Sequence, residues 1–265
     1  MKNSIIAALP GDHPWQSQIL WFDSIDSTNT RAKELAKQGA PAGTVLIADF
    51  QTGGRGRMGR SFHSPAGTGV YMSVILRPCC RPDALMHLTC AVAVAACDAV
   101  ESSTGLRPGI KWTNDLVHGN QKLGGILTEL GLTPGGMVDY AIVGIGLNCG
   151  QHAGDFPEDI RGIAASLAMV IQEAVDRSRV AAALITALHR MDACLLTEKA
   201  TVLAQYRRDC ITLGRDISLL RGEEITHGTA LDIDDTGALI VGFDSGEVQA
   251  VNSGEVSVRG MYGYL

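Results

Sequence analysis

Apolar positions recur with two different spacings along the chain, and the spacing predicts which segments are strands and which are helices. Short apolar or β-branched runs predict strands over residues 21–24, 44–50, 70–76, 110–112, 125–130 and 139–147, with a hairpin over 117–123. Helical spacing predicts helices over residues 30–38, 82–103, 161–173, 177–196 and 199–208. Because helices and strands do not alternate regularly, the pattern indicates an α+β domain with a mixed sheet.

The pattern changes after Leu213, where only short β runs follow. They cover residues 216–220, 225–233, 238–242, 247–251 and 256–259, and glycines separate them. Short strands of this spacing predict a small SH3-like β-barrel at the C-terminal end. We therefore divide the chain into a larger first domain, residues 1–212, and a second domain, residues 213–265.

The same pattern bears on oligomeric state and on location. If the strand over 139–147 has an exposed edge, two copies of the chain could pair there, so a homodimer is possible. The first apolar run, residues 5–9, ends at Pro10 without the features of a signal peptide. Polar residues interrupt the longest apolar stretch, 85–100, which is too short to span a bilayer comfortably. We expect a cytoplasmic protein without a membrane partner.

Charge and cysteine content exclude some classes of protein. A net charge of −6 argues against a general nucleic-acid binder, while leaving room for one local basic site. The chain has seven cysteines, and no pair of them has CxxC spacing. We therefore expect reduced, mostly buried thiols and no bound transition metal.

A glycine- and arginine-rich loop over residues 51–69 is the strongest candidate for a functional segment. Residues 54–59 match the GxGxxG spacing, but the residues from Ser61 onward cannot begin the helix that a dinucleotide site needs. Instead, Arg55, Arg57 and Arg60 alternate with glycines, and guanidinium groups suit phosphate and carboxylate. The loop could stay mobile when empty and close over an anionic ligand; a solvated surface loop is the alternative.

Two further motifs carry candidate chemistry. Lys122 precedes Gly124 and Gly125, so its ammonium could balance a carboxylate–phosphate junction, and Asp115 could hold a metal ion or a ribose hydroxyl. Alternatively, Lys122 is a solvated surface lysine. In 144–148 the alternate glycines leave a flat surface for a ring or another backbone, and Asn148 could meet a purine edge. Alternatively, the glycines form a β-bulge and Asn148 is a capping residue.

Taken together, the motifs resemble those of the biotin–protein ligase family. The match runs in order through 26–29, Gln51, 54–60, 111–115, 122–127, 144–148 and 255–259, and extends over about residues 20–265. The resemblance implies a catalytic domain of the biotin/lipoate ligase type, followed by the SH3-like barrel. About 22 residues precede the first family strand, too few for the DNA-binding helix-turn-helix of longer members, so we expect no operator binding.

The resemblance also implies roles for individual residues. Those expected to bind biotin are Ser27, Thr28, Asn29, Gln51, Arg55, Gly56, Arg57, Lys122 and Gly125. Those expected to bind the nucleotide are Arg57, Arg60, Phe62, Asn114, Asp115, Lys122, Asn148 and Arg259. Those expected to act in catalysis are Lys122, Arg57 and Arg55, and Asp115 would support Mg²⁺ through the nucleotide.

The implied activity is ATP-dependent ligation of biotin to protein. Biotin and ATP would give biotinyl-5'-AMP and pyrophosphate, and the biotinyl group would pass to a lysine of a biotin carboxyl carrier protein. Two departures from the family pattern stand out: Thr113 replaces a usual proline and Phe62 a common tryptophan. A lipoate ligase, a biotin-responsive repressor and a catalytically silent binding module are the alternatives.

Overall fold

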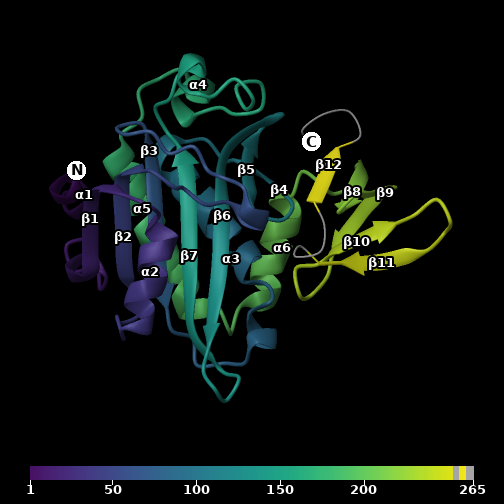
Figure 1. Ribbon diagram of the computed structural model, residues 1–265, viewed down its shortest axis with the longest axis horizontal. Coiled ribbons are helices and arrows are strands. Elements are labelled where there is room, and N and C mark those ends of the chain that lie inside the picture. The colour runs from purple at the N-terminus through teal and green to yellow at the C-terminus, as the bar shows by residue number, and fades with distance from the viewer. Residues whose placement is uncertain (253–256, 261–265) are drawn as a thin grey trace.

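A seven-stranded mixed sheet forms the centre of the larger domain (Figure 1). The computed structural model describes residues 1–252 with their side chains and the backbone of 257–260. The strands are β1 (Ile19–Ile25), β2 (Thr44–Gln51), β3 (Gly69–Leu76), β4 (Gly109–Lys111), β5 (Asp115–His118), β6 (Gln121–Leu132) and β7 (Val138–Asn148). Their order is β1-β2-β3-β7-β6-β5-β4; β1 and β2 are parallel, and the other neighbours are antiparallel.

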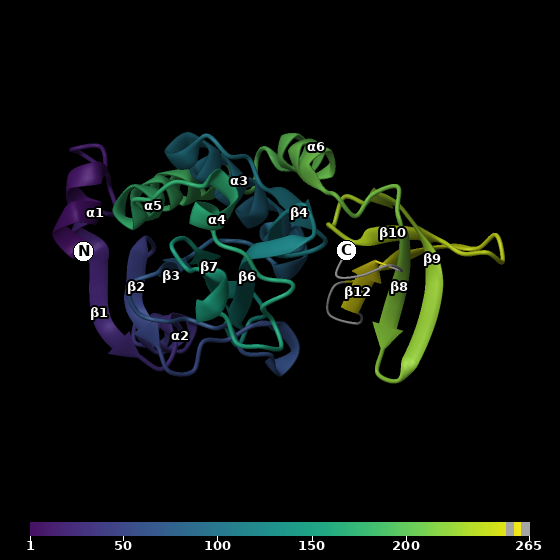
Figure 2. The same ribbon diagram turned by 90° about the horizontal axis from the view of Figure 1, so that it is seen from above.

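Helices cover both faces of this sheet (Figure 2). On one face lie α3 (Leu88–Thr104) and α5 (Arg177–Cys194), whereas α2 (Thr28–Lys37) packs on the opposite face. The other helices are α1 (Lys2–Ala8), α4 (Leu167–Ile171) and α6 (Lys199–Asp209). Short 3₁₀ turns cover Gln16–Gln18, Arg57–Gly59, Pro82–Leu85 and Ala153–Asp155.

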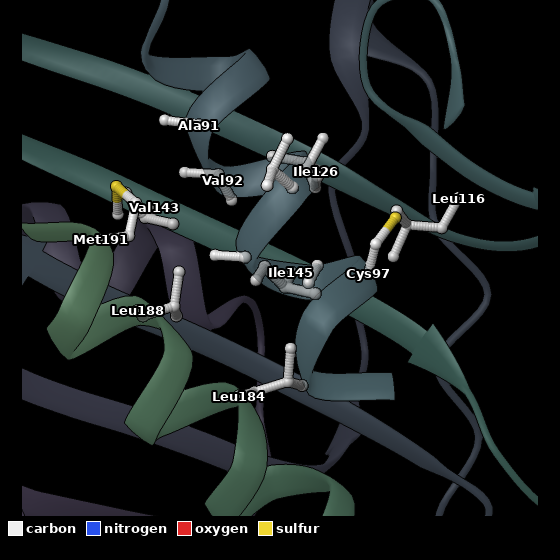
Figure 3. Close-up of a cluster of buried hydrophobic side chains, with 14 of the residues drawn as sticks. Ala91, Val92, Cys97, Leu116, Ile126, Val143, Ile145, Leu184, Leu188 and Met191 are labelled. Carbon is white, nitrogen blue, oxygen red and sulfur yellow. The ribbon is translucent and has the colours of Figure 1, made fainter. Parts of the chain in front are cut away.

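Two-sided burial explains why the central strands are apolar at nearly every position. In β7, Val143 belongs to the large core beneath α3 and α5, and its neighbour Ile142 belongs to a small core beneath α2. Figure 3 shows the large core, where side chains of α3, α5 and the sheet meet, Leu188 and Ile145 among them. The strand predictions succeeded because successive side chains both meet apolar neighbours.

The C-terminal part of the chain folds as a five-stranded antiparallel sheet (Figure 1). Its strands are β8 (Asp216–Arg221), β9 (Glu224–Ile233), β10 (Leu239–Gly242), β11 (Val248–Val251) and β12 (Ser257–Gly260), in the order β11-β10-β9-β8-β12. The predicted fold class, an α+β domain with a mixed sheet followed by a small β domain, is confirmed.

Hydrogen bonds join the larger domain to the C-terminal sheet. The indole Nε1 of Trp112, just after β4, donates to the Gly237 carbonyl in the turn before β10 at 3.0 Å. Arg207 of α6 donates through Nε to the Asp232 carboxylate at 3.0 Å and to the Ile233 carbonyl at 2.9 Å. The C-terminal sheet therefore braces the strand end that carries Trp112.

Two predictions about strands and helices are wrong. β7 is not an edge strand, because β3 and β6 pair with its two sides, so its backbone groups offer no dimer surface. The helix expected over 161–173 is reduced to α4, which begins after the capping residue Ser166. Residues 158–163 before it form turns instead, and Ala164 forms a bridge with Lys122.

Two helical segments also differ from the sequence predictions. Residues 2–8 form α1, which the sequence pattern did not predict, and its Ile5 is fully buried in the large core. The helical segment Pro82–Thr104 has 23 residues and contains an 18-residue window with a mean hydropathy of 1.5, so by length and composition it could cross a membrane, contrary to the sequence prediction. However, 72% of that window is buried inside the protein, as befits a core helix.

Candidate functional site

A cavity of about 540 Å³ opens on the α2 face of the large sheet. On that face of β7, Ile142 packs under α2, and Gly144 and Gly146 follow it along the strand. Ser73 pairs with Gly144 on one side, and Gly125 pairs with Gly146 on the other. Glycine at Gly144 and Gly146 leaves room on the strand for Asn29 and Phe62, both of which line the cavity.

The cavity brings together the residues that the sequence nominated. Its lining includes Ser27, Thr28, Asn29, Gln51, Arg55, Gly56, Arg57, Arg60, Phe62, Asn114, Asp115, Lys122, Gly125 and Asn148. Arg259 lies in β12, where the side chains are outside the described part of the chain. The structure thus places residues from α2, four strands (β2, β5, β6 and β7) and the loop around one space.

One end of the cavity is lined by polar side chains with fixed orientations. The backbone N–H of Thr28 donates to Gln51 Oε1 at 2.9 Å. Because a backbone N–H only donates, the amide nitrogen of Gln51 must face the other way, where it donates to Ser64 Oγ at 2.9 Å. Ser27, only 2% exposed, lies beside them.

Asn29 is held in the same manner. Its Nδ2 donates to the Leu127 carbonyl and to Glu129 Oε2, both at 3.2 Å. Its Oδ1 therefore accepts from the hydroxyl of Ser73, at 2.6 Å. Asn29 lies so close to β7 that a Cβ atom on Gly144 would come within 1.9 Å of Oδ1, so only glycine allows this arrangement.

The other end of the cavity is positively charged. Lys122 and Arg57 lie around Asp115, the single carboxylate among the described lining residues. Arg60 and Lys111 also line the cavity, whereas Arg55 pairs with Glu129. In a protein of net charge −6, this concentration favours an anionic ligand such as a phosphate.

An ion pair joins Lys122 Nζ to Asp115 Oδ1 at 2.6 Å. Asp115 of β5 stands opposite Gly125 of β6, and a Cβ there would lie 3.3 Å from Lys122 Nζ. Gly125 therefore leaves room for the lysine to fold back over the strand. Since both side chains are only partly buried, a ligand in the cavity can reach them.

Arg57 extends from the loop to the same end of the cavity, where its Nη1 donates to Asn114 Oδ1 at 2.9 Å. Asn114 is itself anchored, because its Nδ2 donates to the Ile126 carbonyl at 2.9 Å. Burial lowers the pKa of the Arg57 guanidinium and the charge of Asp115 opposes that shift, while a guanidinium stays protonated near neutral pH.

The glycine- and arginine-rich loop is folded as a short hairpin. Arg55 and Ser61 form an antiparallel bridge, and the Phe62 N–H donates to the Gly54 carbonyl at 2.9 Å. A Cβ on Gly54 would lie 2.4 Å from the Phe62 carbonyl oxygen, which explains this glycine. The closing of the loop on a ligand stays a prediction.

The flat strand surface expected at 144–148 is covered by a side chain of the protein itself, the ring of Phe62. A Cβ on Gly146 would come within 2.5 Å of the Phe62 ring, which lies against the strand there. Asn148 is 5% exposed; its Nδ2 donates to the Ala165 carbonyl at 3.0 Å, and its Oδ1 accepts from Gln151 Nε2 at 3.3 Å. It therefore holds the chain after β7 in addition to lining the cavity.

One wall of the cavity was missed by sequence reasoning. It consists of the apolar residues Phe156, Ile160, Ile163 and Ala164, in the segment between β7 and α4. The Lys122 N–H donates to the Ile163 carbonyl at 2.7 Å, and the Ala165 N–H donates back to the Lys122 carbonyl at 2.9 Å. Apolar residues in a stretch rich in turn formers were the available signal, but their helical spacing suggested a helix instead.

Lys111 and Trp112 also line the cavity, although the sequence gave them no separate role. Both are nearly buried, at 6% and 5% exposed, and the peptide bond after Trp112 is cis. Among the described residues, no cluster of three or more metal-binding side chains occurs. Asp115 is the carboxylate that could meet a cation carried by a ligand.

Two family models match this chain. That of the biotin/lipoate A/B protein ligase family matches residues 21–148, and that of the biotin protein ligase C terminal domain matches residues 212–259. These ranges contain most of the cavity and most of the C-terminal sheet, respectively.

Individual relatives agree with the family models. The chain is 34% identical over 241 residues to the bifunctional ligase/repressor BirA of Bacillus subtilis, covering 91% of this chain and 74% of that protein. It is 33% identical over 240 residues to the biotin–[acetyl-CoA-carboxylase] ligase of Paracoccus denitrificans, covering 89% and 98%. Among solved structures, it resembles a biotin protein ligase from Aquifex aeolicus in complex with biotin and ATP, with a TM-score of 0.77, 29% identity, and coverage of 91% and 98%.

Proposed function

The chain belongs to the biotin protein ligase family, and we propose that it joins biotin to ATP as biotinyl-5'-AMP and transfers the biotinyl group to a carrier-protein lysine. Its cavity carries the proposal, because a polar end with fixed donors and acceptors and a basic end occupy one space of about 540 Å³. That combination suits a ligand with a neutral polar ring at one end and an anionic group at the other.

The polar end fits the ureido ring of biotin. A cyclic urea offers two N–H donors and one carbonyl acceptor, and burying it requires partners for all three. Asn29 Oδ1 has a lone pair left after accepting from Ser73, and the Gln51 amide has a proton left after donating to Ser64. We assign Ser27, Thr28, Asn29 and Gln51 to this ring.

The basic end fits the reaction itself. The biotin carboxylate attacks the α-phosphorus of ATP, the bond to the β-phosphate oxygen breaks, and pyrophosphate leaves. Two anions must approach one another, so the charges of Lys122, Arg55 and Arg57 lower the barrier. When ligand arrives, we expect Lys122 to exchange Asp115 for the carboxylate and the α-phosphate.

Asp115 fits a Mg²⁺ ion carried by ATP, since this metal is often held by one carboxylate together with phosphate oxygens. Bound there, the ion would neutralise charge on the phosphates. We assign Arg60, Phe62, Asn114, Asn148 and Arg259 to the nucleotide on the basis of the family motifs.

Transfer needs no covalent enzyme intermediate. The carrier lysine attacks the carbonyl carbon of the mixed anhydride, an amide bond forms, and AMP leaves. Until then, the Arg55 loop and the apolar wall around Phe156 would keep water from the anhydride. We propose a biotin carboxyl carrier domain as the acceptor.

Mass spectrometry tests the proposal most directly. A purified carrier domain incubated with this protein, biotin and Mg-ATP should gain one biotinyl group. Lys122→Ala should form biotinyl-AMP about a hundredfold more slowly, because it loses an electrostatic stabiliser. Lys37→Ala, an exposed change on α2, serves as the matched control. Near-normal adenylation by Lys122→Ala would rule out the role of this lysine.

Two further measurements separate the alternatives. Adding lipoate in competition with biotin distinguishes a lipoate ligase, and tight biotin binding without transfer would favour a sensor or binding module. A gel shift with operator DNA and biotinyl-AMP tests the prediction that the chain does not bind DNA. Location in the cytoplasm, the absence of a membrane partner and the oligomeric state stay predictions.

A further inference from the structure

Glu129 of β6 carries a partly buried carboxylate next to the polar end of the cavity, and the proposed chemistry does not use it. Its side chain is 18% exposed. Three donors reach it: Lys33 Nζ at 2.6 Å, Asn29 Nδ2 at 3.2 Å, and Arg55 Nη1 at 3.4 Å from each oxygen. Two of them come from α2 and one from the loop, so the carboxylate ties three separate segments together.

The position of Glu129 follows from the register of the sheet. It pairs with Ile142 of β7, and two residues along β6, Leu127 pairs with Gly144. Asn29 lies against that glycine, so its amide lies between the Leu127 carbonyl and the Glu129 carboxylate. Both neighbours accept hydrogen bonds, and neither can donate one.

This placement decides which atom of Asn29 faces the ligand. With Nδ2 turned toward Glu129 and Leu127, the spare lone pair of Oδ1 remains for a ligand N–H. Rotating the amide would place its oxygen against a carboxylate and a carbonyl. The charged acceptor dominates this preference, because hydrogen bonds to an ionised group are about twice as strong as neutral ones.

The charge of Glu129 is maintained by the groups that face it. Burial raises the pKa of this carboxyl, but the hydrogen bonds from Lys33 and Asn29 and the charge of Arg55 outweigh burial, so the pKa lies below its ordinary value. Lys33 faces it from α2 and Arg55 from the loop. The group is therefore ionised at neutral pH.

We propose that Glu129 is a positioning residue that sets the specificity of the polar end, holding Asn29 with its carbonyl oxygen toward the ligand and anchoring Arg55 of the loop to β6. The inference rests on the proposed function, since it takes biotin as the ligand. It assigns to Glu129 a role exerted through other residues, without direct contact with the reacting atoms.

Exchanging the amide of Asn29 and the carboxylate of Glu129 tests whether Glu129 orients Asn29. Asn29→Asp places two carboxylates in contact and should raise the Kd for biotin by about tenfold or more. Glu129→Gln keeps an acceptor for Asn29 and should raise it only a few-fold. In the double variant the new amide donates to the new carboxylate, so the Kd should fall at least about fivefold below that of Asn29→Asp alone.

Calorimetric titration with biotin alone measures these constants without relying on catalysis. Glu34→Gln is the matched control, because it makes the same change on the exposed surface of α2, where Glu34 is 52% exposed and pairs with Arg31. A merely structural carboxylate would make the two losses add, and the double variant would then bind no better than Asn29→Asp alone. That outcome would overturn the inference.

The pH dependence of biotin binding gives a second readout that needs no change at Asn29. Because the pKa of Glu129 is depressed, its hold on Asn29 and Arg55 persists at neutral pH and is lost as the pH falls through that value. Wild-type affinity should decline in that range, and the profile of Glu129→Gln should be flatter. Parallel profiles for the two proteins would contradict the role of the carboxylate.

The anchoring of Arg55 is tested by the escape of biotinyl-AMP. With the loop released, Glu129→Gln should lose the adenylate to solution several-fold faster than wild type. A wild-type protein that binds no biotin would refute the proposed function and this inference together. Normal wild-type activity with unchanged adenylate retention and no rescue in the double variant would refute the inference alone.

Discussion

At the scale of single residues, glycines determine where the cavity can exist. Gly144 and Gly146 lie on the same face of β7 as Ile142, but Asn29 of α2 and the Phe62 ring occupy the places that their side chains would take. Both glycines are therefore required for contact distance, because the backbone there is ordinary strand.

Adding a methyl group at Gly144 tests whether the contact with Asn29 requires glycine there. Gly144→Ala would place Cβ within 1.9 Å of Asn29 Oδ1, so Asn29 must shift. We expect the Kd for biotin to rise by about tenfold or more, since overpacking costs about 1–3 kcal/mol. Calorimetric titration measures it. Gly11→Ala, where an added Cβ meets nothing within 4 Å, should bind normally; equal affinities for both variants would show that the contact does not matter.

A second residue-scale feature lies far from the cavity. His13 is 7% exposed, its Nδ1 accepts from the Trp15 N–H at 3.2 Å, and the His189 ring lies 5.1 Å from its own. Burial lowers the pKa of His13, the charge of His189 lowers it further, and Asp12 opposes both. The folded state therefore takes up this proton less readily than the unfolded chain.

The sign of the pH effect follows from that difference. As the pH falls below the unfolded value of about 6.5, the unfolded chain binds more protons, so the free energy of unfolding decreases. His13→Asn keeps an acceptor for the Trp15 N–H and should flatten this dependence, as measured by urea unfolding over a series of pH values. A slope for His13→Asn equal to that of wild type would contradict the assignment.

At the scale of elements, the sheet separates the large hydrophobic core from the cavity. The core formed by α3, α5 and the sheet lies on one face (Figure 3), whereas the cavity lies on the α2 face. Changes in the large core should therefore affect the free energy of unfolding more than ligand affinity.

Leu188 of α5 tests that separation. It is 1% exposed, and Leu188→Ala should lower the free energy of unfolding by about 2–5 kcal/mol through lost burial and a residual void. Its Kd for biotin should stay close to that of wild type. Leu196→Ala, at a residue 49% exposed, should change stability by less than about 0.5 kcal/mol. Denaturant unfolding compares the two, and similar losses would contradict the assignment.

At the scale of the whole molecule, contacts with the C-terminal part of the chain help to position the wall of the cavity. Trp112 lines it, yet its indole N–H bonds to the Gly237 carbonyl in the C-terminal sheet and its backbone N–H bonds to Thr212 Oγ1 at 2.9 Å. One wall of the cavity is therefore held in place by the second domain.

Trp112→Phe removes the indole donor and leaves the Gly237 carbonyl without that partner. We expect the free energy of unfolding to fall by about 1–3 kcal/mol, because a buried polar group loses its hydrogen bond. Trp21→Phe removes an exposed bond to Asp23 and should cost much less. Thermal and urea unfolding of both variants measure the difference, and equal stabilities would show that the bond between the sheets contributes nothing.

Much of this molecule could be read from local pattern. Strands such as β2 and β3 are apolar because both faces are covered, so their runs stand out. The motifs around Arg57, Lys122 and Gly144 are short, and the chemistry of their side chains is local. The sequence therefore determined the fold class and the family, and every site residue that it nominated with a described side chain lines the cavity.

Only the tertiary structure decided how these segments meet. The central position of β7, and the loss of the expected helix over 161–173, depend on hydrogen bonds to strands distant in sequence. The contacts of Glu129 with Lys33 and Arg55 likewise join segments 96 and 74 residues apart. A local pattern reports which faces of a segment are apolar, whereas its partner is chosen by long-range packing, which no short stretch of sequence contains.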